Sequence, residues 1–322
     1  MSACDGIGRR PATRKTADGL TPVTPRHVHK NHAEEVYLTH WRSTGRDRFF
    51  IRARRPGAHD FYRVGKVFDP LLLCETVRQT FPLLCHDVYD VPLGHQLIWE
   101  RFGYRVADAA YGGMDRGREL TLDVRCFDVV RRGTRAAALS LHAQVYWGGV
   151  PVATADTRFT VQAPAVYRRL RGEHADAGRA MARAVPVPDP DLRTRAGRDL
   201  VRDLVLAPRG ADGRQLRVDT THPLYFDHPV DHVPGMVLLE AVHQSVDGAD
   251  VTALDCTFHR YVELDSHCTI TAGPPGAEHD EHGEPGERHS RITAVQGGEV
   301  RFTAAVTSRA CAVREAAGSG AR

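Results

Sequence analysis

The sequence predicts an α+β fold in which one helix-and-sheet unit occurs twice in tandem. An apolar helical pattern with one acid inside it, DPLLLCETVRQT over residues 69–80, returns as PGMVLLEAVHQS over residues 234–245. Aligning Glu240 with Glu75 gives an offset of 240 − 75 = 165 residues, about half of the 322-residue chain. Long strand patterns follow the first helix. Because this offset exceeds the period of solenoid repeats, it indicates two copies of one domain, each with a long central helix wrapped by an antiparallel sheet.

The first domain is expected over residues 26–162, after a disordered tail of residues 1–25. The tail is rich in Arg, Thr, Pro and Gly and carries little apolar pattern, which is typical of segments that cannot bury a core. Residues 36–41 and 48–53 have strand patterns separated by a turn. They predict a hairpin ahead of the helix.

The first central helix is predicted from Pro70 to about Tyr89. Asp69 suits the N-cap position and Pro70 the first turn. Four apolar residues recur at spacings that place them on one side of the helix: Leu72, Leu73, Val77 and Phe81. Glu75 lies near the buried start of this helix, so it must be either paired or functional, because an isolated buried charge is very costly.

Four strands are predicted after the first helix, at residues 97–106, 120–130, 136–147 and 150–161. Gly148 and Gly149 separate the last two and suit a tight hairpin turn. A hairpin, a helix and then several long antiparallel strands indicate one sheet wrapped around one helix.

A linker is expected over residues 163–199, where the apolar pattern weakens and three prolines interrupt the chain. The pattern also permits one short helix at the start of this linker. The second domain is expected over residues 200–314, followed by a disordered tail of residues 315–322. Its strand patterns lie at residues 200–206, 216–219, 251–261, 267–271, 292–295 and 300–306, with a charged loop at residues 274–289.

The composition is that of a soluble globular protein, with 42% hydrophobic and 26% charged residues. A net charge of +3 is too small to indicate nucleic-acid binding. No apolar run approaches the length of about 18 residues that suggests a membrane span, and the N-terminus lacks a hydrophobic signal core. Seven cysteines without a CxxC pair favour a reducing cytoplasm. No metal site and no cofactor are expected.

A long apolar helix wrapped by an antiparallel sheet and duplicated in tandem is the double hotdog architecture. HPVDHVPGMVLLEAVHQ, over residues 228–244, resembles the loop and helix start of hydroxyacyl carrier-protein dehydratases. In those enzymes a His precedes a Pro-Gly, and a Glu or Asp follows on the helix. His228 and Glu240 match these positions, but their spacing of 240 − 228 = 12 is shorter than usual.

Five further motifs run in order along the chain: VHKNHAEEVYLTHW at 28–41, HDFY at 59–62, DPLLLCETVRQ at 69–79, PLGH at 92–95 and DHPVDHVPGM at 227–236. Together they give a closer resemblance, over most of the chain, to the A-factor synthase family of actinobacteria. The resemblance implies transfer of a β-ketoacyl group from an acyl carrier protein to the hydroxyl of dihydroxyacetone phosphate. The resulting ester leads to a γ-butyrolactone, butenolide or furan-type signalling molecule. Neither nucleic acid nor a membrane is an implied partner.

Acyl transfer to an alcohol needs a base near the hydroxyl and a donor for the thioester oxyanion. No GxSxG elbow is present, so a covalent serine intermediate is not indicated. Glu75 is the first choice for the base, because burial could raise its pKa from about 4.3 toward 6 or 7. The first helix N-terminus, near Leu71 to Leu73, could bind the oxyanion. The alternative is that Glu75 is only a capping acid.

The remaining candidates have both functional and structural interpretations. Glu240 and His228 form the equivalent catalytic pair of the second copy, or a relic of duplication. Arg78 is a phosphate ligand or an ion-pair partner. His243 stands where the resemblance leads us to expect Arg, and its charge would be lost as the pH rises through about 6.5. Further substrate-binding candidates, which could equally be structural, are His59, His95, Gln79 and Gln244.

Two other function classes stay open at this point. One is a non-catalytic acyl- or lactone-binding regulator, although no helix-turn-helix pattern is visible. The other is a hotdog thioesterase or dehydratase. The sequence leaves open whether one or both halves are active, and whether the protein is a monomer or a homodimer.

Overall fold

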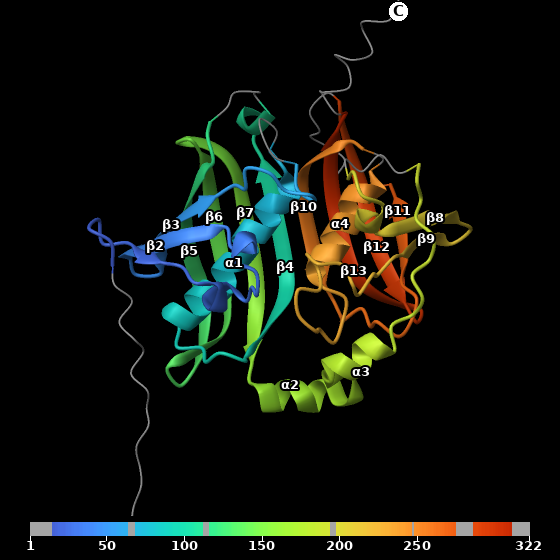
Figure 1. The fold of residues 1–322 in the computed structure, drawn as a ribbon, viewed down its shortest axis with the longest axis horizontal. Coiled ribbons are helices and arrows are strands. Elements are labelled where there is room, and N and C mark those ends of the chain that lie inside the picture. The colour runs from blue at the N-terminus through green and yellow to red at the C-terminus, as the bar shows by residue number, and fades with distance from the viewer. Residues whose placement is uncertain are drawn as a thin grey trace, which may run out of the picture.

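The computed structural model of the chain describes residues 15–63, 68–111, 116–193, 198–246, 248–274 and 286–310. These residues form one 13-stranded sheet with the order β1-β2-β3-β5-β6-β7-β4-β10-β13-β12-β11-β9-β8 (Figure 1). All of its strand pairings are antiparallel. The predicted α+β class with a large antiparallel sheet is therefore confirmed, and so is the expected continuity of the sheet.

The strands before residue 163 are β1 Thr21–Pro22, β2 Leu38–Gly45, β3 Arg48–Arg54, β4 Gln96–Val106, β5 Glu119–Arg132, β6 Arg135–Trp147 and β7 Val150–Gln162. Those after residue 200 are β8 Leu206–Gly210, β9 Gly213–Leu216, β10 Asp250–Phe258, β11 Thr269–Gly273, β12 Glu287–Gln296 and β13 Glu299–Arg309. The helices are α1 Pro70–Asp87, α2 Pro164–Arg171, α3 Ala177–Ala182 and α4 Gly235–Ser245, and short 3-10 turns include η2 Ala33–Glu35 and η5 Val201–Asp203.

Helix α1 is buried on nearly all sides rather than along one stripe. Asp69 caps it, because its Oδ1 accepts a hydrogen bond from the Leu71 N–H at 2.9 Å. Pro70 occupies the first turn, as predicted. Helices α1 and α4 contact each other and lie against the same face of the sheet (Figure 1). A helix enclosed in this way must pair any charge that it carries.

Strands β4 and β10 join the two parts of the sheet. Their register runs from Ala253 opposite Arg105 to Thr257 opposite Arg101. Gly103 lies at the middle of this junction, where a Cβ would approach the Leu254 carbonyl oxygen at 3.0 Å. The absence of a side chain at Gly103 thus permits the close approach of the two strands.

Three predicted boundaries need correction. The strands of the second-domain hairpin were expected at residues 200–206 and 216–219. They are instead β8 and β9, which directly flank the two-residue connection between Gly210 and Gly213. Strand β1 pairs with β2, so the end of the expected tail 1–25 belongs to the sheet. Two helices rather than one, α2 and α3, lie within the expected linker 163–199.

Other expectations fall outside the described residues: residues 1–14 of the first tail, the second tail, and residues 275–285 of the charged loop. Within the part of the chain that the structure describes, no helix is long and apolar enough to cross a membrane.

Candidate active site

A cavity of about 570 Å³ lies between the first and second halves of the chain. Its wall is built from α1, the start of β4, the loop before α4, the first turn of α4 and the end of β10. Its polar lining residues include Lys30, Glu75, Arg78, Asp227 and His228. The volume is typical of small-molecule sites.

The apolar lining of the cavity is rich in aromatic rings. Phe81 stacks on Phe159 with centroids 4.9 Å apart, and Trp99 stacks on Phe258 at 5.1 Å. The Trp99 indole N–H donates to Thr157 Oγ1 at 2.8 Å, which holds the ring in place. The aromatic side of the cavity can therefore bind an apolar chain, while the charged residues on its other side can bind a polar group.

A larger, open recess of about 910 Å³ is lined by β4, β7, β10, β13 and their neighbours in the sheet. It contains none of the predicted site residues. The smaller cavity, where the titratable groups converge, is therefore the candidate active site.

Glu75 is an ion-paired carboxylate. Its Oε2 accepts from Arg78 Nε and its Oε1 from Arg78 Nη2, both at 2.7 Å. Lys30 Nζ lies 3.2 Å from Oε1, and Gln79 Nε2 donates to the same oxygen at 2.9 Å. Burial by itself would raise the pKa, but Arg78 and Lys30 lower the pKa of Glu75 to about 2. The prediction of a pKa near 6 or 7 is wrong, because the two cations outweigh desolvation.

His228 and Asp227 form a hydrogen-bonded pair at the cavity. His228 Nδ1 bonds to Asp227 Oδ1. The Asn31 backbone N–H and side-chain amide hold Asp227 in turn, at 3.3 Å to Oδ2 and 2.9 Å to the carbonyl. Because Nδ1–H points at a carboxylate, the neutral ring leaves Nε2 free to accept a proton. His228 therefore has the geometry of a general base, and Glu75 does not.

Asp227 was not among the predicted site residues. Its side chain is 5% exposed, against 49% for that of His228. The pKa of Asp227 is lowered despite its burial, chiefly by the hydrogen bond from His228 and the charge of Lys30. The signal that could have found it was the carboxylate directly before the motif histidine.

The first turn of α4 is directed at the cavity. Gly235 and Met236 line the wall, and no side chain caps this helix, whose N-cap is Pro234. A Cβ on Gly235 would lie 2.9 Å from Trp99 Cε3, so the close fit depends on glycine. Backbone N–H groups of a first helical turn lack intrahelical partners and attract an anion.

The oxyanion site predicted near Leu71 to Leu73 is not supported. None of those residues lines the cavity, and Asp69 already occupies the Leu71 N–H. The first turn of α4, not that of α1, lines the cavity. The physical reason is that α1 has a capping carboxylate and α4 does not.

Glu240, the acid of the second copy, does not line the cavity. Arg198 Nε and Nη2 donate to its two carboxylate oxygens at 2.9 and 2.8 Å. Arg198 Nη1 also donates to Asp69 Oδ2 at 3.1 Å and to the Phe61 carbonyl at 2.8 Å. Only 3% of the Arg198 side chain is exposed. The carboxylate of the second acid is thus buried and paired with an arginine.

Gln79 and Gln244, predicted as substrate ligands, do not line the cavity and instead tie their helices to neighbouring segments. Gln79 Oε1 accepts from the Tyr37 N–H at 2.9 Å, and its Nε2 donates to the Glu35 carbonyl at 2.7 Å. Both glutamines are fully buried. The corresponding partners of Gln244 are the Val205 N–H at 2.9 Å, the Asp203 carbonyl at 2.8 Å and Glu240 Oε1 at 2.8 Å.

His59 also has a structural position away from the cavity. Its Nε2 lies 3.1 Å from Glu35 Oε1, and its Nδ1 accepts from two backbone N–H groups, of Phe61 and Tyr62. His222 repeats this arrangement, with Nε2 3.0 Å from Asp203 Oδ1 and Nδ1 accepting from the Leu224 N–H. The offset of 222 − 59 = 163 residues reveals a duplicated H-x-x-Y motif that our sequence analysis missed.

His95 lines the cavity, and His243 does not. Burial and the charge of Arg135 lower the pKa of His95. His243 Nε2 lies 3.0 Å from the Tyr104 hydroxyl, and burial lowers the pKa of His243 to about 3. The predicted loss of a His243 charge near pH 6.5 is therefore wrong, because the buried ring is already neutral at that pH.

Acid is expected to destabilise the fold before the carboxylates titrate. His243 and His29 both have folded-state pKa values lowered from 6.5 to about 3. Between these values the unfolded chain binds more protons than the folded one, so the free energy of unfolding falls as the pH drops from 6.5 toward 3. Urea denaturation at pH 7 and pH 5 should show this fall. His243→Asn should reduce this fall in the free energy of unfolding, whereas His32→Asn, at an exposed site, should not. The same pH dependence of stability in His243→Asn and in the unmodified protein would contradict a lowered pKa for His243.

A model of the A-factor biosynthesis hotdog domain matches residues 12–163 and 193–312. The chain belongs to the A-factor biosynthesis hotdog family. In this member of the A-factor biosynthesis family, the first matched segment contributes Glu75 and Arg78 to the cavity, and the second contributes Asp227, His228 and Gly235.

Two relatives in the A-factor biosynthesis family have the name 2-oxo-3-(phosphooxy)propyl 3-oxoalkanoate synthase. The one from Streptomyces virginiae is 38% identical over 305 residues, which are 91% of this chain and 100% of the relative. One from Streptomyces griseus is 36% identical over 305 residues, 91% of this chain and 93% of the relative. Among solved structures, an acyl-ACP thioesterase from Bacteroides thetaiotaomicron superposes with a TM-score of 0.42 at 8% identity, over 81% of this chain and 98% of that one.

Proposed function

We propose that this chain is a cytoplasmic acyltransferase that joins a β-ketoacyl group from an acyl carrier protein to the hydroxyl of dihydroxyacetone phosphate. The product would be a 2-oxo-3-(phosphooxy)propyl 3-oxoalkanoate ester, the compound in the names of the relatives. The observation that carries the proposal is that one cavity is lined by Glu75 and Arg78 of one half and by His228 of the other.

The domain organisation that accompanies this proposal is a tandem double hotdog. Residues 26–162 and 200–314 would each form one hotdog unit around α1 or α4, joined by residues 163–199. The symmetric partners of Gln79 and Gln244 support this division, since each glutamine ties its helix to the segment before the first hairpin.

His228 acts as the general base in the proposed reaction. Its Nε2 takes the proton of the acceptor hydroxyl as the hydroxyl oxygen bonds to the thioester carbonyl carbon. The C–S bond then breaks, and the imidazolium returns the proton to the departing thiolate. Asp227 stabilises the imidazolium and keeps the tautomer that leaves Nε2 free.

Three other sets of groups complete the proposed chemistry. The first turn of α4 donates N–H groups to the oxyanion of the tetrahedral intermediate. Arg78 and Lys30 face the acceptor's phosphate, and Glu75 positions both cations. The aromatic rings around Trp99 hold the acyl chain. In this proposal Glu75 is a positioning residue, because its pKa near 2 makes it too weak a base.

The decisive test is an assay of the purified chain with a β-ketoacyl carrier protein, with and without dihydroxyacetone phosphate. Release of the carrier thiol that depends on the phosphate compound, together with the phosphorylated ester by mass spectrometry, supports transfer. Release without the acceptor would indicate a thioesterase. Absence of release with binding retained would indicate a regulator.

Arg78→Lys is expected to raise the KM for dihydroxyacetone phosphate by about tenfold, and the KM for the acyl donor much less. A lysine retains one charge but loses the bidentate geometry that suits both Glu75 and a phosphate. Arg260→Lys is a suitable comparison, because Arg260 also lines the cavity but pairs with Glu299 at 3.6 Å. Equal increases in both KM values for Arg78→Lys would contradict a phosphate role.

A further inference from the structure

Helix α2, Pro164–Arg171, lies beside the candidate active site. The Tyr167 hydroxyl donates to Asp231 Oδ2 at 2.7 Å, and the other oxygen of Asp231 bonds to His232 Nδ1 at 2.7 Å. The Arg171 guanidinium lies over the Tyr261 ring, 4.0 Å from its centroid. Since His232 and Tyr261 line the cavity, the buried face of α2 is attached to the cavity wall.

The other faces of α2 present two arginines and a leucine to solvent. Arg168 and Arg169 are exposed, and Leu170 is 64% exposed. In the part of the chain that the structure describes, no ion pair involves Arg168 or Arg169. Arg171, by contrast, is neutralised by Asp231 at 3.1 Å and Glu263 at 2.6 Å. The outer surface of α2 thus combines free positive charge with an exposed apolar side chain.

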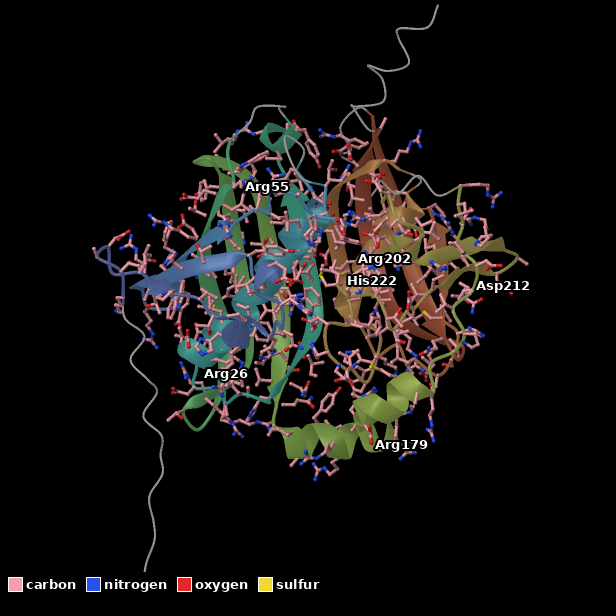
Figure 2. All side chains as sticks on the ribbon, in the orientation of Figure 1. Arg26, Arg55, Arg179, Arg202, Asp212 and His222 are labelled. Atoms are coloured by element: carbon pink, nitrogen blue, oxygen red, sulfur yellow. The ribbon has the colours of Figure 1, made fainter. Side chains whose placement is uncertain are left out.

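The nearby segment, residues 172–183, has two arginines and two acids, so its formal charge does not cancel that of α2. Arg179 lies on α3, at the same end of the molecule as α2 (Figure 2). Two acids lie between these helices, but both have partners in this segment: Glu173 pairs with Arg183 at 3.5 Å, and Asp176 caps α3 through the Arg179 backbone N–H at 3.0 Å. The exposed arginines therefore remain available to an outside partner.

We propose that α2 is the docking surface for the acidic carrier protein that brings the acyl thioester, with Arg168, Arg169 and Leu170 as its contacts. This inference rests on the proposed function. A carrier protein presents acidic helices, and its thioester sits at the end of a flexible arm. Docking beside His232 and Tyr261 puts that arm at the cavity wall. Charge complementarity at such a rim raises the association rate and selects the partner.

The acceptor phosphate is a less suitable occupant of this surface. Successive helical residues are separated by about 100°, so Arg169 projects away from Tyr167, which faces the cavity wall. A small anion held by Arg169 would lie outside the site of reaction. A macromolecule that contacts the outer face and inserts only its arm does not meet this difficulty.

The test compares two acyl donors in the double charge reversal Arg168→Glu/Arg169→Glu. With the β-ketoacyl carrier protein as donor, kcat/KM is expected to fall about tenfold or more at low salt, and less as salt screens the surface. With the same acyl group on N-acetylcysteamine, kcat/KM should stay within about twofold. The matched control is Arg46→Glu/Arg209→Glu, with the same charge change at two exposed positions, one between β2 and β3 and one in β8, far from α2 in the strand order of the sheet.

The outcomes separate this inference from the proposed function. Equal losses with both donors, or an increased KM for dihydroxyacetone phosphate, would overturn docking at α2 while leaving acyl transfer intact. An equal loss in the Arg46/Arg209 control would mean that overall charge, not α2, attracts the carrier. Absence of transfer from either donor in the unmodified protein would defeat the proposed function itself. Leu170→Asp provides a second variant, expected to weaken only the reaction with the carrier-bound donor.

Discussion

Replacing His228 with Asn is expected to lower kcat for acyl transfer by about 10²- to 10⁴-fold, the usual cost of losing a positioned general base. The His228 side chain is 49% exposed, so the fold should be nearly unaffected. Asp227→Asn should cause a smaller but clear loss, because the ring can then adopt the wrong tautomer. Steady-state kinetics with thermal denaturation as the control for folding would test both variants.

A second Asp-His pair in the same loop makes this test discriminating. His232 Nδ1 bonds to Asp231 at 2.7 Å, and His232 also lines the cavity. Asp231, however, is already engaged with Tyr167 and Arg171 of α2. We therefore expect His232→Asn to have a much smaller effect than His228→Asn. A severe loss in His232→Asn with a mild one in His228→Asn would assign the base to the other pair.

Glu75→Gln should lower kcat less than His228→Asn does, and it should also destabilise the fold. Removing the carboxylate leaves Arg78 and Lys30 without their shared partner. Breaking a buried ion pair from one side costs about 3 to 5 kcal/mol. A loss of activity larger than that of His228→Asn, with stability unchanged, would restore Glu75 as the base.

The second large effect is expected from Arg198→Ala, which should lower the free energy of unfolding by about 3 to 5 kcal/mol. The arginine pairs with two buried carboxylates, Glu240 and Asp69. Its removal leaves Glu240 with no other ion pair among the described residues, while Asp69 retains Arg63 at 3.9 Å. Arg202→Ala is the control, because that side chain is 45% exposed and should contribute at most about 1 kcal/mol. Urea denaturation would measure the difference.

A double variant tests whether the buried pair of Glu240 and Arg198 contributes to catalysis. In Arg198→Met/Glu240→Leu the buried pair is replaced by apolar groups, which is often neutral for stability. We expect this variant to recover most of the stability lost in Arg198→Ala and to keep its acyltransfer rate. A stable double variant with little activity would show that Glu240 contributes to the reaction after all.

The duplicated acid-bearing helices, the long strands and the tight glycine turns were predictable because they depend on local patterns. A helical period, a strand run and a Gly-Gly hairpin are each encoded within a few residues. The H-x-x-Y repeat was equally local and was missed because only the helices were aligned. The family motifs likewise named His228 and Arg78, although not what surrounds them.

Only the tertiary structure decided which acid faces a cavity and which is sealed. Glu75 and Glu240 have similar local sequences, but Lys30 and Arg78 partner the first, whereas Arg198 closes off the second. The tertiary structure also brought His228 to the cavity that Glu75 and Arg78 line, and it reversed the expected pKa shift of Glu75. The physical reason is that a buried group's pKa depends on charges a few ångströms away in space, and no local pattern states which distant residues the fold will place there.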